Sequence, residues 1–375
     1  MQFIDLAAQQ SRISDSVHRR IETVLKHGRY ILGPEVEELE QTLCAYTGAA
    51  HCVSCASGTD ALLMALMAHE VGVNDAILTT PFTFVATAEV IALLGATPVF
   101  VDIDPRTYNI DPAALRATLE GLGSGKRPTP RFPENLNVRG IIAVDIFGLP
   151  ADYDAIEAVA GEHGLFVIED AAQSFGAECK GRKACTTAPT ATTSFFPAKP
   201  LGCYGDGGAV FCGNRHMAEE LRSLRVHGQG ETKYDNVRIG INGRMDTIQA
   251  AVLLAKMEVF DEELRLRRQV AARYSEGLSG KFVTPSVPEG FASAWAQYSI
   301  QSENRDATVA ELSKAGIPSA IYYRTPLHLQ SAFTFLGYQR GDFPVSEEVA
   351  GRILSLPMHP YLGEEEQERI VTALT

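Results

Sequence analysis

Residues 140–170, GIIAVDIFGLPADYDAIEAVAGEHGLFVIED, contain the pattern that decides the fold. Apolar runs over 140–145 and 165–169 flank an amphipathic segment at 152–163. Short apolar runs bounded by turn residues are typical of buried parallel strands, and the segment between them has the length of a helix. The stretch therefore predicts a strand–helix–strand unit.

The same alternation extends from about residue 45 to 250. Further apolar runs predict strands, and amphipathic segments predict helices; the strands are at 51–55, 76–80 and 97–102, and the helices at 60–69 and 86–94. Alternating strands and helices form a mostly parallel sheet with both faces covered, and ligands bind at the carboxyl ends of its strands. We therefore predict an α/β fold.

The ends of the chain predict further parts. A long charged helix is expected at 258–278, and the residues after about 282 have strands and helices of their own. We divide the chain into an N-terminal segment (1–25) that packs with the small domain, a large domain (26–257), and a linking helix with a small α+β domain (258–375). The Gly- and Pro-rich insertion 121–137 is expected to be an exposed excursion, because it has no apolar period.

Composition restricts the classes of function. The chain has 375 residues, of which 45% are hydrophobic and 21% charged, as in ordinary globular proteins. Its formal net charge of −13 argues against binding nucleic acid or anionic membranes. The N-terminus lacks the features of a signal peptide, and no apolar stretch is long enough to cross a bilayer.

The cysteines indicate the compartment. They number seven and are irregularly spaced, which favours reduced thiols in the cytoplasm over a disulfide framework. Cys52 and Cys55 form a lone CxxC without a second pair, so we interpret them as small residues on a buried strand and predict no metal site.

Three clusters of residues can carry chemistry. In the first, Ser57-Gly58-Thr59-Asp60 follows a strand and begins a helix. Unpaired backbone N–H groups at such a helix start can bind an anion, and Thr59 adds a hydroxyl. Ser and Thr are also ordinary helix caps, so this segment alone leaves both interpretations open.

The second cluster is Glu169-Asp170 at the end of an apolar strand. A buried carboxylate needs a partner, and Asp170 can reach a cleft at the strand end, although a structural ion pair explains it equally well. The third is Lys199, which lies in an aromatic, Gly- and Pro-rich turn without a neighbouring acid. A desolvated lysine has a lowered pKa, and its neutral amine can form a Schiff base. Glycines at 202–208 allow positive φ and close approach by a ligand.

The three clusters together match one cofactor. A helix start with Thr59 suits a phosphate, Asp170 suits a protonated pyridine nitrogen, and Lys199 suits an aldehyde. Those are the requirements of pyridoxal phosphate, which acts as an electron sink. A nicotinamide dehydrogenase would instead need GxGxxG after the first strand, and residues 57–60 lack it.

The sequence also resembles a family, the DegT-type nucleotide-sugar aminotransferases, which have the aspartate aminotransferase-like (type I) fold. The resemblance covers nearly the whole chain; its motifs are FIDL (3–6), YILGPEV (30–36), SGTDAL (57–62), PFTFVAT (81–87), EDAAQ (169–173), SFFPAK (194–199), NGRMD (242–246) and LPMHP (356–360). It implies a large domain with a mixed, mostly parallel sheet and a smaller α+β C-terminal domain.

The resemblance implies roles at the matching positions. Lys199 would form the imine with the cofactor and move the substrate proton, and Asp170 would hold the pyridine nitrogen protonated. The other implied cofactor contacts are Gln173 near the 3′-oxygen, Phe84 against the ring, Gly58, Thr59 and Ser194 at the phosphate, and Asn242 at the phosphate of the neighbouring subunit. A homodimer with shared active sites would follow. Simpler interpretations remain for Phe84 (core), Asn242 (turn) and Ser194 (strand hydroxyl).

The substrate is indicated by the closest subgroup, which acts on UDP-linked 3-oxo sugars derived from N-acetylglucosamine or its uronic acid. Uronate-specific members have a His-Tyr pair where this chain has Tyr322-Tyr323, followed by Arg324. Tyrosine carries no positive charge near neutral pH. Either Arg244 and Arg324 bind the carboxylate, or the sugar is neutral.

We therefore predict a ping-pong aminotransferase that uses L-glutamate, with Arg244 as the candidate for its carboxylate. The product would enter surface-polysaccharide or lipopolysaccharide biosynthesis. A 4-oxo sugar aminotransferase and a non-enzymatic regulatory relative are the alternatives. A related dehydratase would have histidine in place of Lys199.

Overall fold

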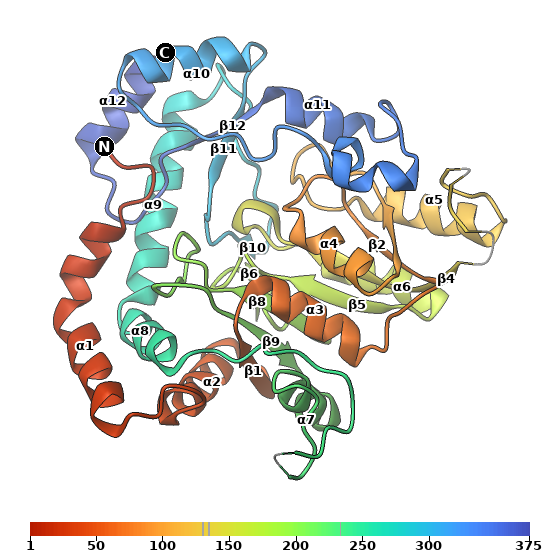
Figure 1. Ribbon diagram of the computed structural model, residues 1–375. Helices are drawn as coiled ribbons and strands as arrows, with labels where there is room; N and C mark the ends of the chain where they lie inside the picture. Colours follow the sequence, from red (N-terminus) through yellow and green to blue (C-terminus); the bar gives the residue numbers. More distant parts are fainter. Residues whose placement is uncertain (130, 134–135, 233) are drawn as a thin grey trace.

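The structure is a computed structural model that describes residues 1–129, 131–133, 136–232 and 234–375 (Figure 1). Its centre is a seven-stranded sheet in the order β1-β9-β8-β5-β4-β2-β3. The strands are β1 (His51–Cys55), β2 (Asp75–Thr79), β3 (Thr97–Phe100), β4 (Asn137–Val144), β5 (Phe166–Asp170), β8 (Thr190–Ser194) and β9 (Gly208–Cys212). The α/β prediction is confirmed, and the predicted strands all lie in this sheet.

The pairing of the sheet is mixed. Strands β3, β2, β4, β5 and β8 are parallel neighbours, whereas β9 is antiparallel to both β8 and β1. The expectation that 51–55 forms a parallel pair is therefore wrong, although β1 runs in the same direction as β8. The reason is that β9 returns from β8 with Gly208 opposite both Ser194 and Cys55, and so separates the two strands.

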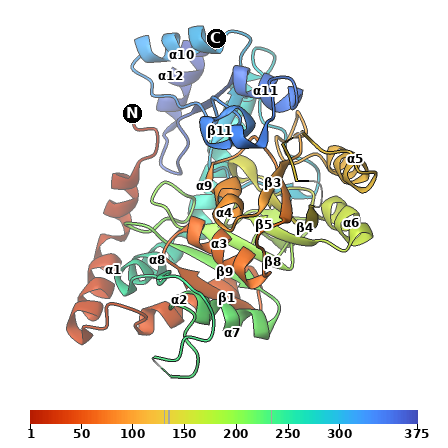
Figure 2. The same cartoon turned by 45° about the vertical axis from the view of Figure 1, so that its right-hand side comes forward.

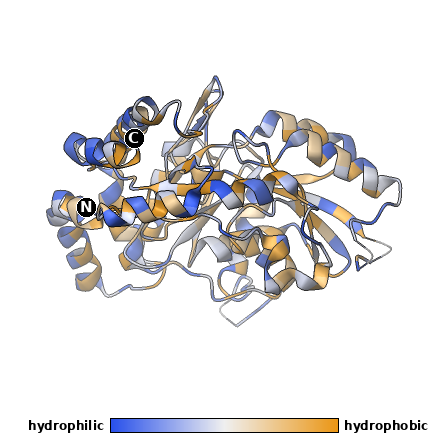
Figure 3. Ribbon diagram, turned by 90° about the horizontal axis from the view of Figure 1, so that it is seen from above, coloured by the Kyte–Doolittle hydropathy of each residue, from blue (hydrophilic) through white to orange (hydrophobic). Residues whose placement is uncertain are grey.

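Helices cover both faces of the sheet. They are α2 (Pro34–Thr47), α3 (Gly58–Ala68), α4 (Ala86–Leu93), α5 (Pro112–Gly123), α6 (Tyr153–His163), α7 (Arg215–Leu224) and α8 (Thr247–Met257). Ile141 packs in the core with α5 and α6, and the next residue, Ile142, packs in the core with α3 and α7. Successive strand residues point to opposite faces, so each strand serves two cores. The helices carry hydrophobic and hydrophilic stretches side by side (Figure 3).

The C-terminal region lies beyond the end of this sheet, as Figures 1 and 2 show. It consists of α9 (Phe260–Leu278), β11 (Tyr298–Gln301), α10 (Arg305–Lys314), α11 (Pro344–Arg352), β12 (Ile353–Leu356) and α12 (Glu364–Leu374). Strands β11 and β12 pair antiparallel, and the core beneath them includes Tyr274, Tyr298 and Ile370. The predicted charged helix corresponds to α9. Short strands β6 (Glu178–Cys179), β7 (Arg182–Lys183) and β10 (Phe291–Ala292) form a small separate sheet.

The N-terminal segment has contacts on both sides. Helix α1 (Leu6–His27) packs through Ile13 and Val17 against α8. The residues before it contact the C-terminal region, because the carbonyl of Phe3 accepts a hydrogen bond from Met358 N at 3.1 Å. The division of the chain at 25 and 257 remains a prediction.

One C-terminal segment returns to the large sheet. We call residues 327–343, which include the short helices η2 (Leu327–Leu329) and η3 (Ser331–Leu336), the aromatic strap. The rings of Phe333, Tyr338 and Phe343 surround Phe100 of β3, with centroids 5.6–6.1 Å away. Leu327 N also donates to the carbonyl of Pro81 at 2.8 Å. The segment between α10 and α11 is therefore part of the large core.

The insertion 121–137 differs from the expected exposed excursion. Helix α5 continues to Gly123 and β4 begins at Asn137. Phe132 is only 3% exposed, and its ring lies 5.5 Å from that of Tyr338 in the aromatic strap. Most described residues of the insertion are exposed or half-exposed, as expected, and the insertion differs from the expectation only at Thr129 and Phe132, which are buried on a core that is remote in sequence. Residues 130, 134 and 135 lie outside the described part of the chain.

Candidate active site

The three predicted clusters meet at one edge of the sheet. Strands β1, β5 and β8 run in the same direction, so their carboxyl ends, at Cys55, Asp170 and Ser194, lie at the same edge. Ligands of doubly wound sheets bind outside such ends. The sheet order therefore assembles residues that lie far apart in the sequence.

Asp170 is a buried carboxylate with few partners. It is 4% exposed; its Oδ2 accepts from Thr87 Oγ1 at 2.9 Å and its Oδ1 from Ala172 N at 3.2 Å. Burial raises the pKa of Asp170, while these hydrogen bonds and the charge of Lys199 lower it. The carboxylate is thus held in place while one cation, Lys199, acts on it.

Lys199 lies in the turn after β8. Its backbone N donates to the carbonyl of Phe196 at 2.9 Å, which closes the turn, and Phe195 beside it is buried. Burial lowers the pKa of Lys199 to about 8, against the opposing influence of Asp170. A sizeable fraction of this amine is therefore neutral in mildly alkaline water, as a nucleophilic lysine requires.

The turn before α3 forms a compact anion cradle. Ser57 caps the helix, because its Oγ accepts from Asp60 N at 3.0 Å, so the first-turn N–H groups of Gly58 and Thr59 point away from the helix body. A Cβ on Gly58 would lie 2.6 Å from the Cβ of Ser194. This close approach brings the Ser194 hydroxyl beside the helix start.

The glycines after Lys199 act differently from the expectation. Gly202, Gly205, Gly207 and Gly208 have no positive φ, so that part of the prediction is wrong. They allow backbone segments to approach one another instead: a Cβ on Gly208 would lie 2.3 Å from the carbonyl oxygen of Ser57. The absence of side chains here packs the strand end against the cradle.

Gln173 and Tyr323 meet at the site. Gln173 is 4% exposed; its Oε1 accepts from Phe147 N at 2.8 Å, and its Nε2 donates to Tyr323 Oη at 3.3 Å. Burial and the charge of Asp170 raise the pKa of Tyr323, so its hydroxyl stays protonated. Tyr323 therefore joins the C-terminal region to the segment after β5 through Gln173.

The structure does not bring all the predicted residues together. The ring of Tyr322 lies 6.5 Å from that of Phe3. Phe84 and Asn242 are exposed, and so is Arg324, which lines a hollow with Thr325, Gln330 and Ser331. Arg244 is half-buried, and its Nε has no partner among the described residues.

Two contacts of the site were missed by the sequence analysis. The sequence predicted Thr87 only as part of the PFTFVAT motif. Its hydrogen bond to Asp170 joins the first turn of α4 to the end of β5, two elements that are far apart in the sequence. The sequence could not predict the backbone N–H of Phe147 as a donor, because a main-chain N–H does not depend on the type of side chain. Asp145, two residues before Phe147, follows β4, and its N donates to the carbonyl of Asp170 at 3.1 Å.

The donor set fits pyridoxal phosphate. A helix start with two hydroxyls can hold a phosphate, a buried carboxylate can face a ring nitrogen, and a lysine with a lowered pKa can react with an aldehyde. No group of His, Cys, Asp and Glu in the described residues could hold a metal ion. No helix of the described chain could span a membrane.

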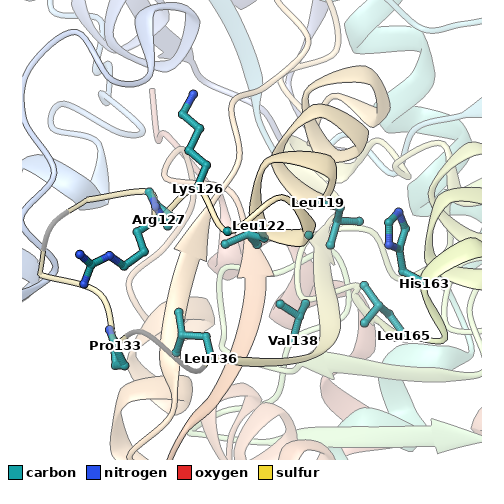
Figure 4. A pocket seen from close by; sticks show the side chains of 12 residues that line it. Leu119, Leu122, Lys126, Arg127, Pro133, Leu136, Val138, His163 and Leu165 are labelled. Atoms are coloured by element: carbon teal, nitrogen blue, oxygen red, sulfur yellow. The ribbon is translucent and has the colours of Figure 1, made fainter.

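A second hollow lies at the opposite edge of the sheet. It has a volume of about 280 Å³ and lies between α5 and the amino ends of β4 and β5 (Figure 4). Leu119, Leu122, Val138 and Leu165 line it, with Lys126 and His163 at its margin. Because ligands of such sheets bind at the carboxyl ends, this hollow is not the candidate active site.

Comparison with known proteins shows the family of the chain. The model of the DegT/DnrJ/EryC1/StrS aminotransferase family matches residues 11–375. A UDP-2-acetamido-2-deoxy-3-oxo-D-glucuronate aminotransferase of Pseudomonas aeruginosa is 48% identical over 100% of this chain and 99% of its own length. A UDP-N-acetyl-3-dehydro-alpha-D-glucosamine 3-aminotransferase of Acidithiobacillus ferrooxidans is 40% identical over 99% and 96%. A protein of Geobacillus stearothermophilus named pleiotropic regulatory protein is 41% identical over 98% and 96%.

Solved structures give the same result. A DegT DnrJ EryC1 StrS aminotransferase from Brucella abortus is 51% identical, with a TM-score of 0.95 over 100% of this chain and 98% of that one. NtdA from Bacillus subtilis, solved with the cofactor PMP, is 26% identical, with a TM-score of 0.87 over 99% and 82%. The expected fold is confirmed, and the chain belongs to the DegT/DnrJ/EryC1/StrS aminotransferase family.

Proposed function

We propose that this protein is a pyridoxal phosphate-dependent aminotransferase that transfers an amino group from L-glutamate to the 3-oxo group of a UDP-linked 2-acetamido sugar. One observation carries the proposal: a half-buried lysine, Lys199, whose pKa is lowered to about 8, lies within electrostatic reach of the buried carboxylate of Asp170, beside a helix start suited to a phosphate. Membership of the family and the names of its relatives support the same activity.

The residues divide the work between them. When bound, pyridoxal phosphate supplies an aldehyde and a ring that accepts electrons from the substrate carbon. Asp170 can hold a proton on a ring nitrogen, because its carboxylate is buried and fixed by Thr87. Gly58, Thr59 and Ser194 would hold the phosphate. Phe84 would cover the ring, and Gln173 would donate to an oxygen on its edge.

Lys199 performs the proton transfer in this scheme. Its neutral Nζ can attack an aldehyde, and it can also take a proton from the substrate carbon and return it to an acceptor. A pKa near 8 suits both tasks, because the amine gains and loses a proton close to working pH.

The acceptor sugar is proposed from the relatives and from the cations near the site. The relative that is 48% identical is named for a 3-oxo glucuronate and the one that is 40% identical for a 3-dehydro glucosamine, so a 3-oxo UDP-sugar is favoured over a 4-oxo sugar. Arg244 offers an unpartnered buried Nε, and Arg324 lines a hollow of about 470 Å³ beside Tyr323. These cations, together with Tyr323, would bind anionic groups of glutamate and the sugar nucleotide.

Absorbance spectroscopy tests the activity. The protein incubated with pyridoxal phosphate should become yellow, lose that colour with L-glutamate, and regain it with a UDP-linked 3-oxo sugar. Supplying the glucuronate and the neutral sugar in parallel decides between the two acceptors. A colourless protein after incubation would overturn the proposal and favour a regulatory relative, and colour recovery with a 4-oxo sugar alone would move the keto position.

We also propose a homodimer with shared active sites, in the reducing cytoplasm. Two apolar side chains are exposed in the single chain, Phe84 at 55% and Ile239 at 87%. Asn242 is also exposed. Its neighbour Gly243 lies near the anion cradle, because the carbonyl of Gly243 accepts a hydrogen bond from Ala56 N. The seven cysteines are all free thiols, which suits that compartment.

Mixing two inactive chains tests the shared site. Lys199→Ala and Asn242→Asp damage opposite sides of the same site if the partner supplies Asn242. When the two variants are unfolded and refolded together in equal amounts, about a quarter of all sites should be intact. Half of the dimers are then hybrids, and each hybrid contains one undamaged site. No recovery, in a protein that weighs as a dimer, would show that each chain forms its site alone.

A further inference from the structure

The amide of Gln173 has only one allowed orientation. The backbone N–H of Phe147 can only donate, so the atom that meets it at 2.8 Å must be Oε1. The Nε2 atom therefore faces Tyr323 Oη and the proposed cofactor. If Phe147 did not supply this donor, the amide could turn over and present an acceptor to the site.

Phe147 holds its N–H donor in place in an unfavourable backbone conformation. Its φ of 58° is left-handed, which is uncommon for a bulky residue. The ring packs edge-on against Phe82 and Tyr108, with centroids 6.2 and 6.0 Å away. Asn109 Oδ1 also accepts from Ile146 N at 2.9 Å, so the turn is fixed on both sides of the strained residue.

The same turn contacts the C-terminal region on its other side. The carbonyl of Phe147 accepts from Gln297 N at 3.3 Å, and that of Gly148 accepts from Ala294 N at 2.9 Å. A Cβ on Gly148 would lie 2.8 Å from the backbone N of Trp295 and 3.1 Å from the carbonyl oxygen of Gln173. Gly148, at φ 100°, thus lies in direct contact with both Gln173 and Trp295.

We propose that the turn Phe147-Gly148 is a positioning element that orients the Gln173 amide and couples it to Trp295, so that a change at the active site is transmitted to the C-terminal region. The coupling is short, because a single peptide group separates the donor to Gln173 from the carbonyl that holds Ala294. The proposal rests on the proposed function only in that pyridoxal phosphate is the ligand used to change the site.

The test uses a reporter that the chain already contains. Trp295 is the only tryptophan in the sequence, so protein labelled with 5-fluorotryptophan gives one fluorine environment. Fluorine NMR is recorded before and after loading with pyridoxal phosphate, and absorbance reports the occupancy separately. Loading should move the resonance of Trp295 in the wild-type chain.

Gln173 variants decide whether the turn transmits that change. Gln173→Leu and the shorter Gln173→Asn remove the acceptor for Phe147 N–H, and should abolish the shift on loading. Gln173→Glu keeps an acceptor and should retain the shift. Gln367→Leu is the matched control, because Gln367 is also a buried glutamine, and its Nε2 donates to the carbonyl of Val270 at 2.9 Å rather than to a residue that packs on the turn. It should leave the shift intact.

Each outcome bears on the proposal. A shift that persists in Gln173→Leu, or that is absent from the fully loaded wild type, overturns it. A wild type that does not bind pyridoxal phosphate refutes the proposed cofactor instead. The spectra of the unloaded proteins then test the coupling, because loss of the acceptor for Phe147 N–H in Gln173→Leu or Gln173→Asn must still move the Trp295 resonance. An unmoved resonance there also overturns the proposal.

Discussion

Glu169 and Asp170 are neighbours on β5, both buried, yet their surroundings differ. The Glu169 carboxylate faces one side of the sheet, where it accepts from the backbone N–H groups of Cys185, Thr187 and Ala188 at 2.7–3.3 Å. The Asp170 carboxylate faces the other side, where Thr87 and Ala172 donate and Lys199 is the nearby cation. Burial raises the pKa of both.

The difference shows how a fold separates structure from chemistry. Backbone N–H groups in fixed positions satisfy the Glu169 carboxylate, so its role is to hold the 185–188 turn. Asp170 has fewer fixed donors and can interact with a cation or a ligand. Adjacent residues obtain opposite roles because successive side chains of a strand point to opposite faces.

Removing the cation opposite Asp170 should have the largest effect. Lys199→Ala is expected to lower turnover on the order of 10⁴-fold or more, because the nucleophile and the proton carrier are lost together. The measurement is steady-state turnover with glutamate and the 3-oxo sugar. Lys256→Met is the matched control, since Lys256 is a buried lysine whose pKa is also lowered to about 8, and it lies over the ring of Tyr204. Appreciable turnover in the alanine variant would show that the nucleophile is elsewhere.

Neutralising Asp170 tests the chemical side of the comparison. Asp170→Asn keeps the size of the side chain and removes its charge, and should lower turnover by about 10²–10³-fold, as loss of a preorganised electrostatic contact does. Thermal unfolding should change little, because the remaining oxygen can accept from Ala172 N while the new amide NH2 donates to the Thr87 hydroxyl, which can also accept. A near-wild-type rate would remove the role assigned to this carboxylate.

Neutralising Glu169 should give the opposite result. Glu169→Gln replaces one acceptor oxygen with a donor that opposes the N–H groups of 185–188, and should lower the free energy of unfolding by about 1–3 kcal/mol. Urea titration measures this loss, and turnover measured at a temperature where the variant is folded should be nearly unchanged. The contrast between the two carboxylates fails if Glu169→Gln loses activity without losing stability.

The smallest effect concerns pH. The neutral form of Lys199 reacts with an aldehyde, so the rate at which the unloaded protein takes up pyridoxal phosphate should rise with pH through about 8. Asp170 raises the pKa of Lys199 and burial lowers it, so Asp170→Asn should move the midpoint to a lower pH. Stopped-flow absorbance across this range measures the shift. A midpoint that moves to higher pH would contradict the facing arrangement.

Much of the sheet was predictable, because apolar runs between turn residues identify buried strands without knowledge of their partners. The carboxylates at the end of β5 and the lysine after β8 were predictable in the same way, since a charge at the end of an apolar strand is unusual. The place of Asp170 at the strand end favoured it over Glu169, although periodicity alone does not decide between the two. Periodicity assigns them to opposite faces but does not say which helices cover each face.

Other features depend on tertiary contacts that leave no local pattern. The antiparallel insertion of β9, the N–H of Phe147 and the burial of Phe132 are each decided by a partner far away in sequence. The aromatic strap is the largest of these: a turn-rich segment between two helices gives no indication that its rings fill the core around Phe100.

The aromatic strap has a consequence for synthesis of the chain. The hydrophobic core that includes β2, β3 and β4 also includes Phe343, so it cannot close while the ribosome has produced only the first 257 residues. The nascent large domain must keep an open apolar face around Phe100 until the strap emerges. The order of synthesis thus makes this core one of the last parts of the molecule that can be completed.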